Sequence, residues 1–189
     1  MRMKVFALLA VFAFGVFAMH GVAAADNVAL NKTVTASGSY SLASGTSLGT
    51  IVDGNFVPET TQWQSNVWWN GLGTSFTINL NGTFVINSFT IQADDNDTYR
   101  VSYWDAGSSS WKTAWDVPSV RSWGLVTRDS GALGPSTTTQ LLFQATGGDN
   151  SYGVSEIQAH GSAVPLPPAF FLLGPGLGGL AMMRRRFKK

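Results

Sequence analysis

Residues 75–82 read Ser-Phe-Thr-Ile-Asn-Leu-Asn-Gly, with polar and apolar side chains alternating up to Leu80. A period of two is typical of a strand that has one face in a core and the other in water. The Asn81-Gly82 pair predicts a tight turn at the end of this strand. The stretch therefore favours a β protein over a helical one.

Similar short runs, rich in Val, Ile, Thr, Phe and Trp, recur from Thr33 to His160 between clusters of Gly, Asn, Asp and Ser. None of them has the period of a helix over about ten residues. Further strands are predicted over 84–91, 99–103, 111–116, 124–127, 138–145 and 154–160. Many short strands joined by turns indicate an all-β, antiparallel sandwich or jelly roll.

Composition excludes several classes of function. The 189 residues include no cysteine, which rules out thiol catalysis and zinc sites built on cysteine. Both histidines, His20 and His160, lie away from any predicted pocket, so no enzyme activity is expected. Between residues 26 and 163, five cations stand against eleven anions, a net charge of −6. Nucleic-acid binding needs clustered Lys and Arg, so no nucleic-acid partner is expected.

The first 25 residues have the organisation of a secretory signal peptide. Arg2 and Lys4 precede an apolar run over 5–19, and Ala23-Ala24-Ala25 offers a small-residue cleavage site before Asp26. We expect residues 1–25 to be removed on export. An uncleaved membrane anchor is the alternative.

Residues 163–189 combine three features in order. The segment Val164-Pro165-Leu166-Pro167 precedes an apolar stretch to Met183, and a basic end follows over 184–189. About 20 apolar residues span a bilayer, and basic residues stay on the cytoplasmic side. These features by themselves indicate a stop-transfer anchor, a transmembrane helix that leaves the preceding domain outside the cytoplasm.

The same order of features resembles the PEP-CTERM sorting signal of Gram-negative bacteria, although Leu166 stands where the commonest motif has Glu. The resemblance implies an exosortase-like membrane protease as a partner. It also implies transient anchoring in the inner membrane, followed by delivery to the cell surface or extracellular matrix. A eukaryotic lipid-anchor signal is the rival, but such tails end in apolar residues.

Four segments of the intervening region, 26–162, carry a second resemblance. They are Val28-Ala29-Leu30-Asn31-Lys32-Thr33-Val34-Thr35-Ala36-Ser37, Ile51-Val52-Asp53-Gly54-Asn55, Thr61-Gln62-Trp63-Gln64-Ser65 and Ser155-Glu156-Ile157-Gln158-Ala159-His160-Gly161. Their order resembles the discoidin-like (coagulation factor type C) domain, whose carbohydrate-binding branch is family 32. The resemblance implies an eight-stranded β-sandwich with a core Trp63, and loops at one end that bind a ligand, most often a glycan. Lipid and protein binders share this architecture.

The discoidin resemblance also implies a structural calcium ion. The matching positions are Asp53, Thr61 and Glu156, with Asn55 as a further oxygen donor. Ca²⁺ takes about six to eight oxygen ligands, and Gly54 allows a tight loop around an ion. Without the resemblance, Asp53-Gly54 is an ordinary turn and Glu156 is a charge on an edge strand.

Polar loop residues and a tryptophan form the predicted glycan site. In sugar-binding relatives the loop at 94–97 lies on the binding face, and its carboxylates and amide suit sugar hydroxyls. Trp123, beside a predicted loop, is the expected platform for a sugar ring. The predicted residues are Asp94, Asp95, Asn96, Asp97, Arg100 and Trp123. A solvated turn or a second metal site at 94–97 is the alternative.

These features together predict an exported, non-catalytic surface or matrix protein that binds carbohydrate, with the cell's own exopolysaccharide as the expected polymer. The alternative is a structural or adhesive envelope protein that contacts protein partners and has no sugar site. An exposed aromatic ring beside converging polar groups at one loop end would favour the first function.

Overall fold

The computed structural model describes residues 26–165. The predicted signal peptide, 1–25, and residues 166–189 of the predicted sorting tail lie outside this range. Between residues 26 and 165, no helix has the length and apolar character needed to cross a bilayer.

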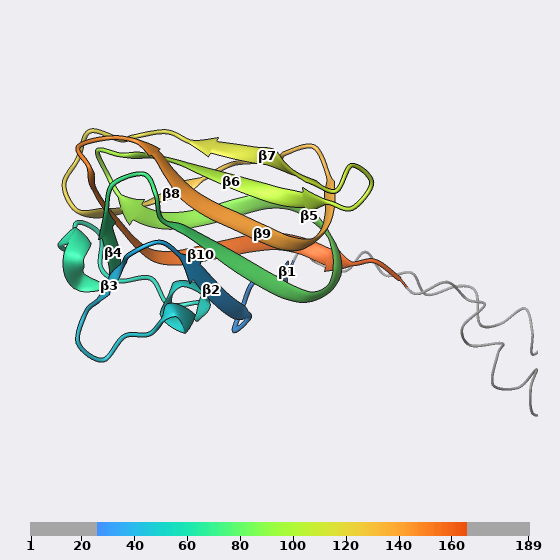
Figure 1. The fold of residues 1–189 in the computed structure, drawn as a ribbon, viewed down its shortest axis with the longest axis horizontal. Helices are drawn as coiled ribbons and strands as arrows, with labels where there is room; N and C mark the ends of the chain where they lie inside the picture. The colour runs from blue at the N-terminus through green and yellow to red at the C-terminus, as the bar shows by residue number, and fades with distance from the viewer. Residues whose placement is uncertain (1–25, 166–189) are drawn as a thin grey trace, which may run out of the picture.

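Ten strands and two short 3-10 helices make up the described region (Figure 1). The strands are β1 (Asp26–Asn27), β2 (Thr33–Ser37), β3 (Ser41–Leu42), β4 (Val67–Asn70), β5 (Ser75–Asp94), β6 (Thr98–Asp105), β7 (Ser110–Val117), β8 (Leu125–Asp129), β9 (Ser136–Gly147) and β10 (Ser151–Ala163). The helices are η1 (Leu48–Val52) and η2 (Trp63–Ser65). All pairings between these strands are antiparallel, so the all-β antiparallel prediction is confirmed, with ten strands in place of eight.

Strand β5 belongs to both layers of the sandwich. Its first part, 75–79, pairs with β2 and β9. Its later part, 84–94, still pairs with β9 over 84–86 and also pairs with β10 and β8. Between them Asn81 has a φ of 55°, and the register with β9 slips. The predicted tight turn at Asn81-Gly82 is therefore wrong. Asn tolerates this left-handed backbone, and β5 bends from one layer to the other because it leaves β9 after residue 86 and continues beside β10 and β8.

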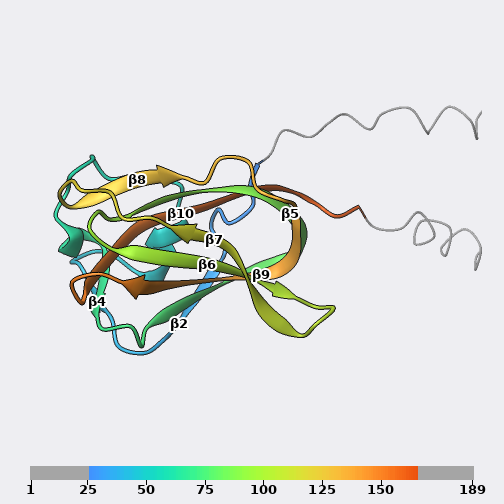
Figure 2. The same ribbon diagram turned by 90° about the horizontal axis from the view of Figure 1, so that it is seen from above.

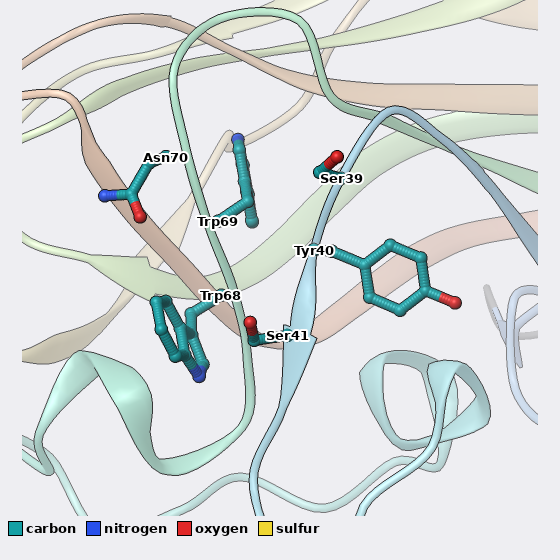
Figure 3. Close-up of a pocket in the computed structure, with 6 residues that line it drawn as sticks. All are labelled: Ser39, Tyr40, Ser41, Trp68, Trp69 and Asn70. Carbon is teal, nitrogen blue, oxygen red and sulfur yellow. The ribbon is translucent and has the colours of Figure 1, made fainter.

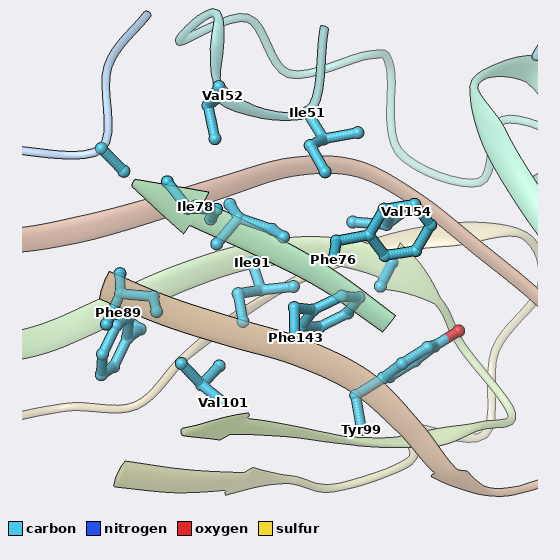
Figure 4. Packing of buried hydrophobic residues seen from close by; sticks show 14 of the residues in the cluster. Ile51, Val52, Phe76, Ile78, Phe89, Ile91, Tyr99, Val101, Phe143 and Val154 are labelled. Atoms are coloured by element: carbon cyan, nitrogen blue, oxygen red, sulfur yellow. The ribbon is translucent and has the colours of Figure 1, made fainter. Parts of the chain in front are cut away.

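The two layers have the strand orders β8-β5-β10-β4-β3 and β2-β5-β9-β6-β7, with β1 beside β10 (Figures 1 and 2). The apolar side chains of β5 that alternate along 75–80 point between them. Phe76 and Ile78 meet Ile91 and Phe143 there, all buried (Figure 4). The period-two pattern of β5 thus builds the core as predicted.

Trp69 occupies the aromatic centre of this core. Its ring is 1% exposed and lies 5.0 Å from Phe76 and 5.7 Å from Tyr152, centroid to centroid. Trp63, predicted in the core, is instead half-buried and packs edge-on against Trp68 at 5.4 Å. The prediction for Trp63 is wrong because η2 places this residue outside the sandwich, over β4.

Antiparallel pairing gathers several loops at one end of the sandwich, which we call the loop end. It comprises residues 71–74, 95–97, 118–124 and 148–150. Asp26 and Ala163, near the two ends of the described chain, lie at the opposite end (Figure 1). Any ligand at the loop end is therefore held away from the points where the chain enters and leaves the domain.

Candidate functional site

Three of the predicted glycan ligands, Asp94, Asp95 and Asp97, are buried at the loop end, whereas Asn96 is exposed. Asp95 Oδ2 accepts a hydrogen bond from Ser122 N at 2.8 Å. Asp97 Oδ1 accepts one from the backbone N–H of residue 149 at 3.2 Å. The buried carboxylates therefore tie the 95–97 loop to the loops at 118–124 and 148–150.

Arg128 of β8 supports these loops from beneath. The side chain is 6% exposed, and its guanidinium donates to the carbonyl oxygens of Asp94 at 2.7 Å and Pro118 at 3.0 Å. A third hydrogen bond reaches the carbonyl of Asp97 at 3.3 Å. Arg128 was not predicted, because a single Arg at the end of a strand carries no signal of burial. It fixes the backbone on which the exposed groups stand.

Burial changes the ionisation of the acidic loop. It raises the pKa of Asp94 to about 7, and repulsion from Asp97 adds to this increase. Burial likewise raises the pKa of Asp97 to about 6. Both carboxyl groups therefore bind protons more tightly in the folded than in the unfolded protein.

Stability should consequently fall as the pH rises. The contribution of these protonated carboxyls is fully present below about pH 3.8 and is lost as the pH rises through about 6 to 7. Asp94→Asn should flatten this dependence and raise the free energy of unfolding by on the order of 2 kcal/mol at pH 8. Urea unfolding of the wild type and of Asp94→Asn at intervals from pH 5 to pH 8 measures how the free energy of unfolding depends on pH in each protein. Parallel curves for the two proteins would contradict the assignment.

Trp123 is the most exposed large hydrophobic residue of the described region, at 60%. Its neighbours hold the backbone firmly: Ser122 N donates to Asp95 Oδ2, and the Gly124 carbonyl accepts from Asp95 N at 3.0 Å. Gly124 has a φ of +69°, and a Cβ there would come within 2.2 Å of a backbone oxygen. Because the backbone is already fixed, a ligand that stacks on the ring has to order only the Trp123 side chain.

A pocket of about 150 Å³ lies between β3 and β4 (Figure 3). It is lined by Ser39, Tyr40, Ser41, Trp68, Trp69 and Asn70. Figure 3 shows Trp68 and Asn70 on one side of the strand pair, Tyr40 on the other and Ser41 between the two rings. Aromatic walls with a few hydroxyl and amide groups suit a small polar ligand with apolar faces. Sequence reasoning missed this pocket, because only the pairing of β3 with β4 creates it.

Arg100 lies apart from these groups. It projects from β6, and its Nε donates to Asp116 Oδ1 of β7 at 2.6 Å. Trp104 and Trp111 form a second aromatic pair on the same two strands, 5.4 Å apart and toward the end opposite the loop end. The structure therefore brings together Trp123 and the 95–97 loop, and it gives Arg100 a different partner.

Two of the predicted calcium ligands approach each other. Glu156 is buried and its Oε1 accepts a hydrogen bond from Gly54 N at 3.0 Å, while its Oε2 has no partner. Burial raises the pKa of Glu156 to about 8, and the nearby charge of Asp53 contributes. An orphaned buried oxygen beside a second carboxylate fits a cation. No cluster of three or more His, Cys, Asp or Glu residues suited to a metal occurs within 26–165.

The other two predicted calcium ligands have different surroundings. The Thr61 hydroxyl donates to the carbonyl of Pro58, and the Thr61 carbonyl accepts from Leu125 N at 2.7 Å. Asn55 is exposed, and its backbone N–H donates to Asp53 Oδ1 at 2.8 Å. Their roles as calcium ligands stay predictions.

Solved structures show what this fold is similar to. A family 32 carbohydrate-binding module of Streptococcus pneumoniae EndoD matches with a TM-score of 0.53 at 16% identity, covering 71% of this chain and 98% of the module. Chitosan-binding module 2 of a Paenibacillus sp. IK-5 chitosanase/glucanase, solved with chitotriose, matches with a TM-score of 0.52 at 22% identity, covering 71% and 100%.

A third similar structure is the fucolectin of striped bass (Morone saxatilis) serum, with a TM-score of 0.56 at 13% identity. The match covers 75% of this chain and 50% of the lectin. These likenesses show the fold, a discoidin-like β-sandwich as found in family 32 modules. No model of a known protein family matches the sequence, and no curated protein matches it.

Proposed function

We propose that this protein is a non-catalytic carbohydrate-binding protein and that the loop end is its binding face. The observation that carries the proposal is Trp123, an exposed ring on a fixed backbone at the loop end. Structural neighbours solved with oligosaccharides, among them chitotriose, support a glycan as the ligand. Asn96, exposed on the adjoining loop, supplies an amide for sugar hydroxyls.

The expected affinity for a single sugar is weak. A small ligand on an open surface buries little area and gives up well-hydrated hydroxyls, so we expect a Kd on the order of 0.1 to 1 mM. The proposed biological ligand is a polymer, the exopolysaccharide of the producing cell, on which many copies act together. Co-sedimentation of the protein with this polysaccharide tests the proposal. A folded protein that stays in the supernatant at every polymer concentration contradicts it.

We further propose a structural calcium ion held by Asp53 and Glu156. The unpartnered Glu156 Oε2 would coordinate the ion, and the positive charge of the ion would offset the cost of burying the carboxylate. Binding to the folded state alone should stabilise it by about 2.7 kcal/mol at a hundredfold excess over Kd. Thermal unfolding with calcium and with a chelator should therefore differ, and Asp53→Ala should abolish the difference. Equal melting temperatures for the wild type in both buffers would refute the site.

The proposed route to the surface is export followed by sorting. It rests on the cleavage site before Asp26 and on the order of features in residues 163–189. We expect a mature chain that begins at or near Asp26 and that an exosortase-like protease has cut near Val164-Pro165, so that the apolar stretch and residues 184–189 are lost. Intact-mass measurement of protein from the cell surface and medium checks both ends. A surface form that retains residues 184–189 would contradict the proposed cleavage.

A further inference from the structure

The loops of the loop end form a continuous row. They follow the strand order β8-β5-β10-β4 of the layer beneath them. Hydrogen bonds join each loop to the next: Ser122 N to Asp95 Oδ2 at 2.8 Å, Asn96 Nδ2 to Asp149 Oδ2 at 3.0 Å, and Asn70 Nδ2 to the Asn150 carbonyl at 3.1 Å. The backbone N–H of Gly71 also donates to the Asn150 carbonyl, at 3.2 Å. A ligand that follows the row therefore meets one surface whose parts are fixed to one another.

Each end of this row has an aromatic side chain. Trp123 is exposed at the β8 end. At the β4 end, Trp68 of β4 is half-buried, packs edge-on against Trp63 and lines the pocket between β3 and β4 (Figure 3). Between them lie the exposed polar side chains of Asn96, Asp149 and Asn150. Stacking surfaces at both ends, with hydrogen-bonding groups between, match the alternation of apolar faces and hydroxyl rims along a sugar chain.

The separation of the two aromatic ends sets the length of ligand. Three strand spacings of about 4.8 Å separate β8 from β4, or about 14 Å in all. A single sugar ring cannot span this distance, but a chain of several sugars can. Contacts at both ends of one sugar chain also strengthen binding. Once one end of the sugar chain is bound, the other end is held close to its own contact.

We infer that the loop end binds an extended glycan chain of several sugars laid along this row, with Trp123 and the Trp68 pocket as its two end contacts. The inference rests on the proposed function and adds the class of ligand: an internal stretch of a polysaccharide rather than one terminal sugar. It also assigns a binding role to the pocket residues Ser41, Trp68 and Asn70.

Calorimetric titration with chitooligosaccharides and cello-oligosaccharides of one to six sugars tests this inference. Affinity for at least one series should rise by about tenfold or more from the disaccharide to the hexasaccharide. Trp123→Ala should remove most of that rise. So should Ser41→Phe, which fills the pocket, and Trp68→Ala, which removes its wall. Trp111→Ala, toward the opposite end of the sandwich, is the control and should show the same increase in affinity with chain length as the wild type. Melting temperatures verify that each variant is folded.

Three outcomes separate the claims. A wild-type affinity that is the same for two and six sugars overturns the extended chain and leaves the proposed function standing. Unchanged hexasaccharide affinity in both folded pocket variants also overturns it. If no length of either series binds, this inference is overturned, whereas the proposed function is decided separately by co-sedimentation with the exopolysaccharide.

Discussion

Replacing Trp69 with alanine is expected to lower the free energy of unfolding by about 3 to 5 kcal/mol, a large part of the stability of a typical domain. The ring is fully buried and is surrounded by Phe76, Tyr99, Phe143 and Tyr152. Its Nε1 has no hydrogen-bond partner, so the loss comes from packing and from the cavity left behind. Urea unfolding of the two proteins at one pH measures the difference.

Trp111→Ala is the matched control for this substitution. The Trp111 ring is 37% exposed and packs against Trp104 at the sheet edge, so its removal should cost about 1 kcal/mol or less. The loss of unfolding free energy in Trp63→Ala should lie between the losses in Trp69→Ala and Trp111→Ala, because Trp63 is half-buried and contacts Trp68. A Trp69→Ala protein as stable as Trp111→Ala would show that the core is not centred on Trp69.

Trp123→Ala is expected to weaken glycan binding by about 1 to 3 kcal/mol, roughly 5- to 150-fold in Kd, while the melting temperature stays close to that of the wild type. The ring makes few protein contacts to lose because it is 60% exposed, whereas a stacked sugar would lose its platform. Trp123→Phe should restore part of the affinity, since a smaller ring still stacks. Titration calorimetry with the tightest-binding oligosaccharide gives the values.

The fold could be predicted well from local pattern. The alternation over 75–80 places Phe76, Ile78 and Leu80 in the core because a strand can bury only one face. The path after Leu80 could not be predicted, since Asn-Gly favours a hairpin locally and long-range pairing with β9 and β10 decides otherwise. The core tryptophan could not be predicted either, because composition does not determine whether Trp63 or Trp69 lies at the centre of the core.

The candidate site was predictable only in part. A polar cluster beside a strand end marked the 95–97 loop, and the exposure of Trp123 agrees with a platform. The burial of Asp94 and Asp97 could not be read from sequence because it depends on Arg128 and on the loop at 148–150. Adjacent acidic residues look solvated until a distant cation and backbone N–H groups are brought to them.

A glycan microarray probed in parallel with the wild type and the Trp123→Ala and Trp111→Ala variants tests the central claim most directly. The array separates binding at the loop end from general adhesion, because all three proteins share the same fold and nearly the same charge. We expect a set of glycans that the wild type and Trp111→Ala bind and that Trp123→Ala does not bind. Folded wild-type protein that binds no glycan, or a Trp123→Ala protein that binds the same set with equal strength, would contradict it.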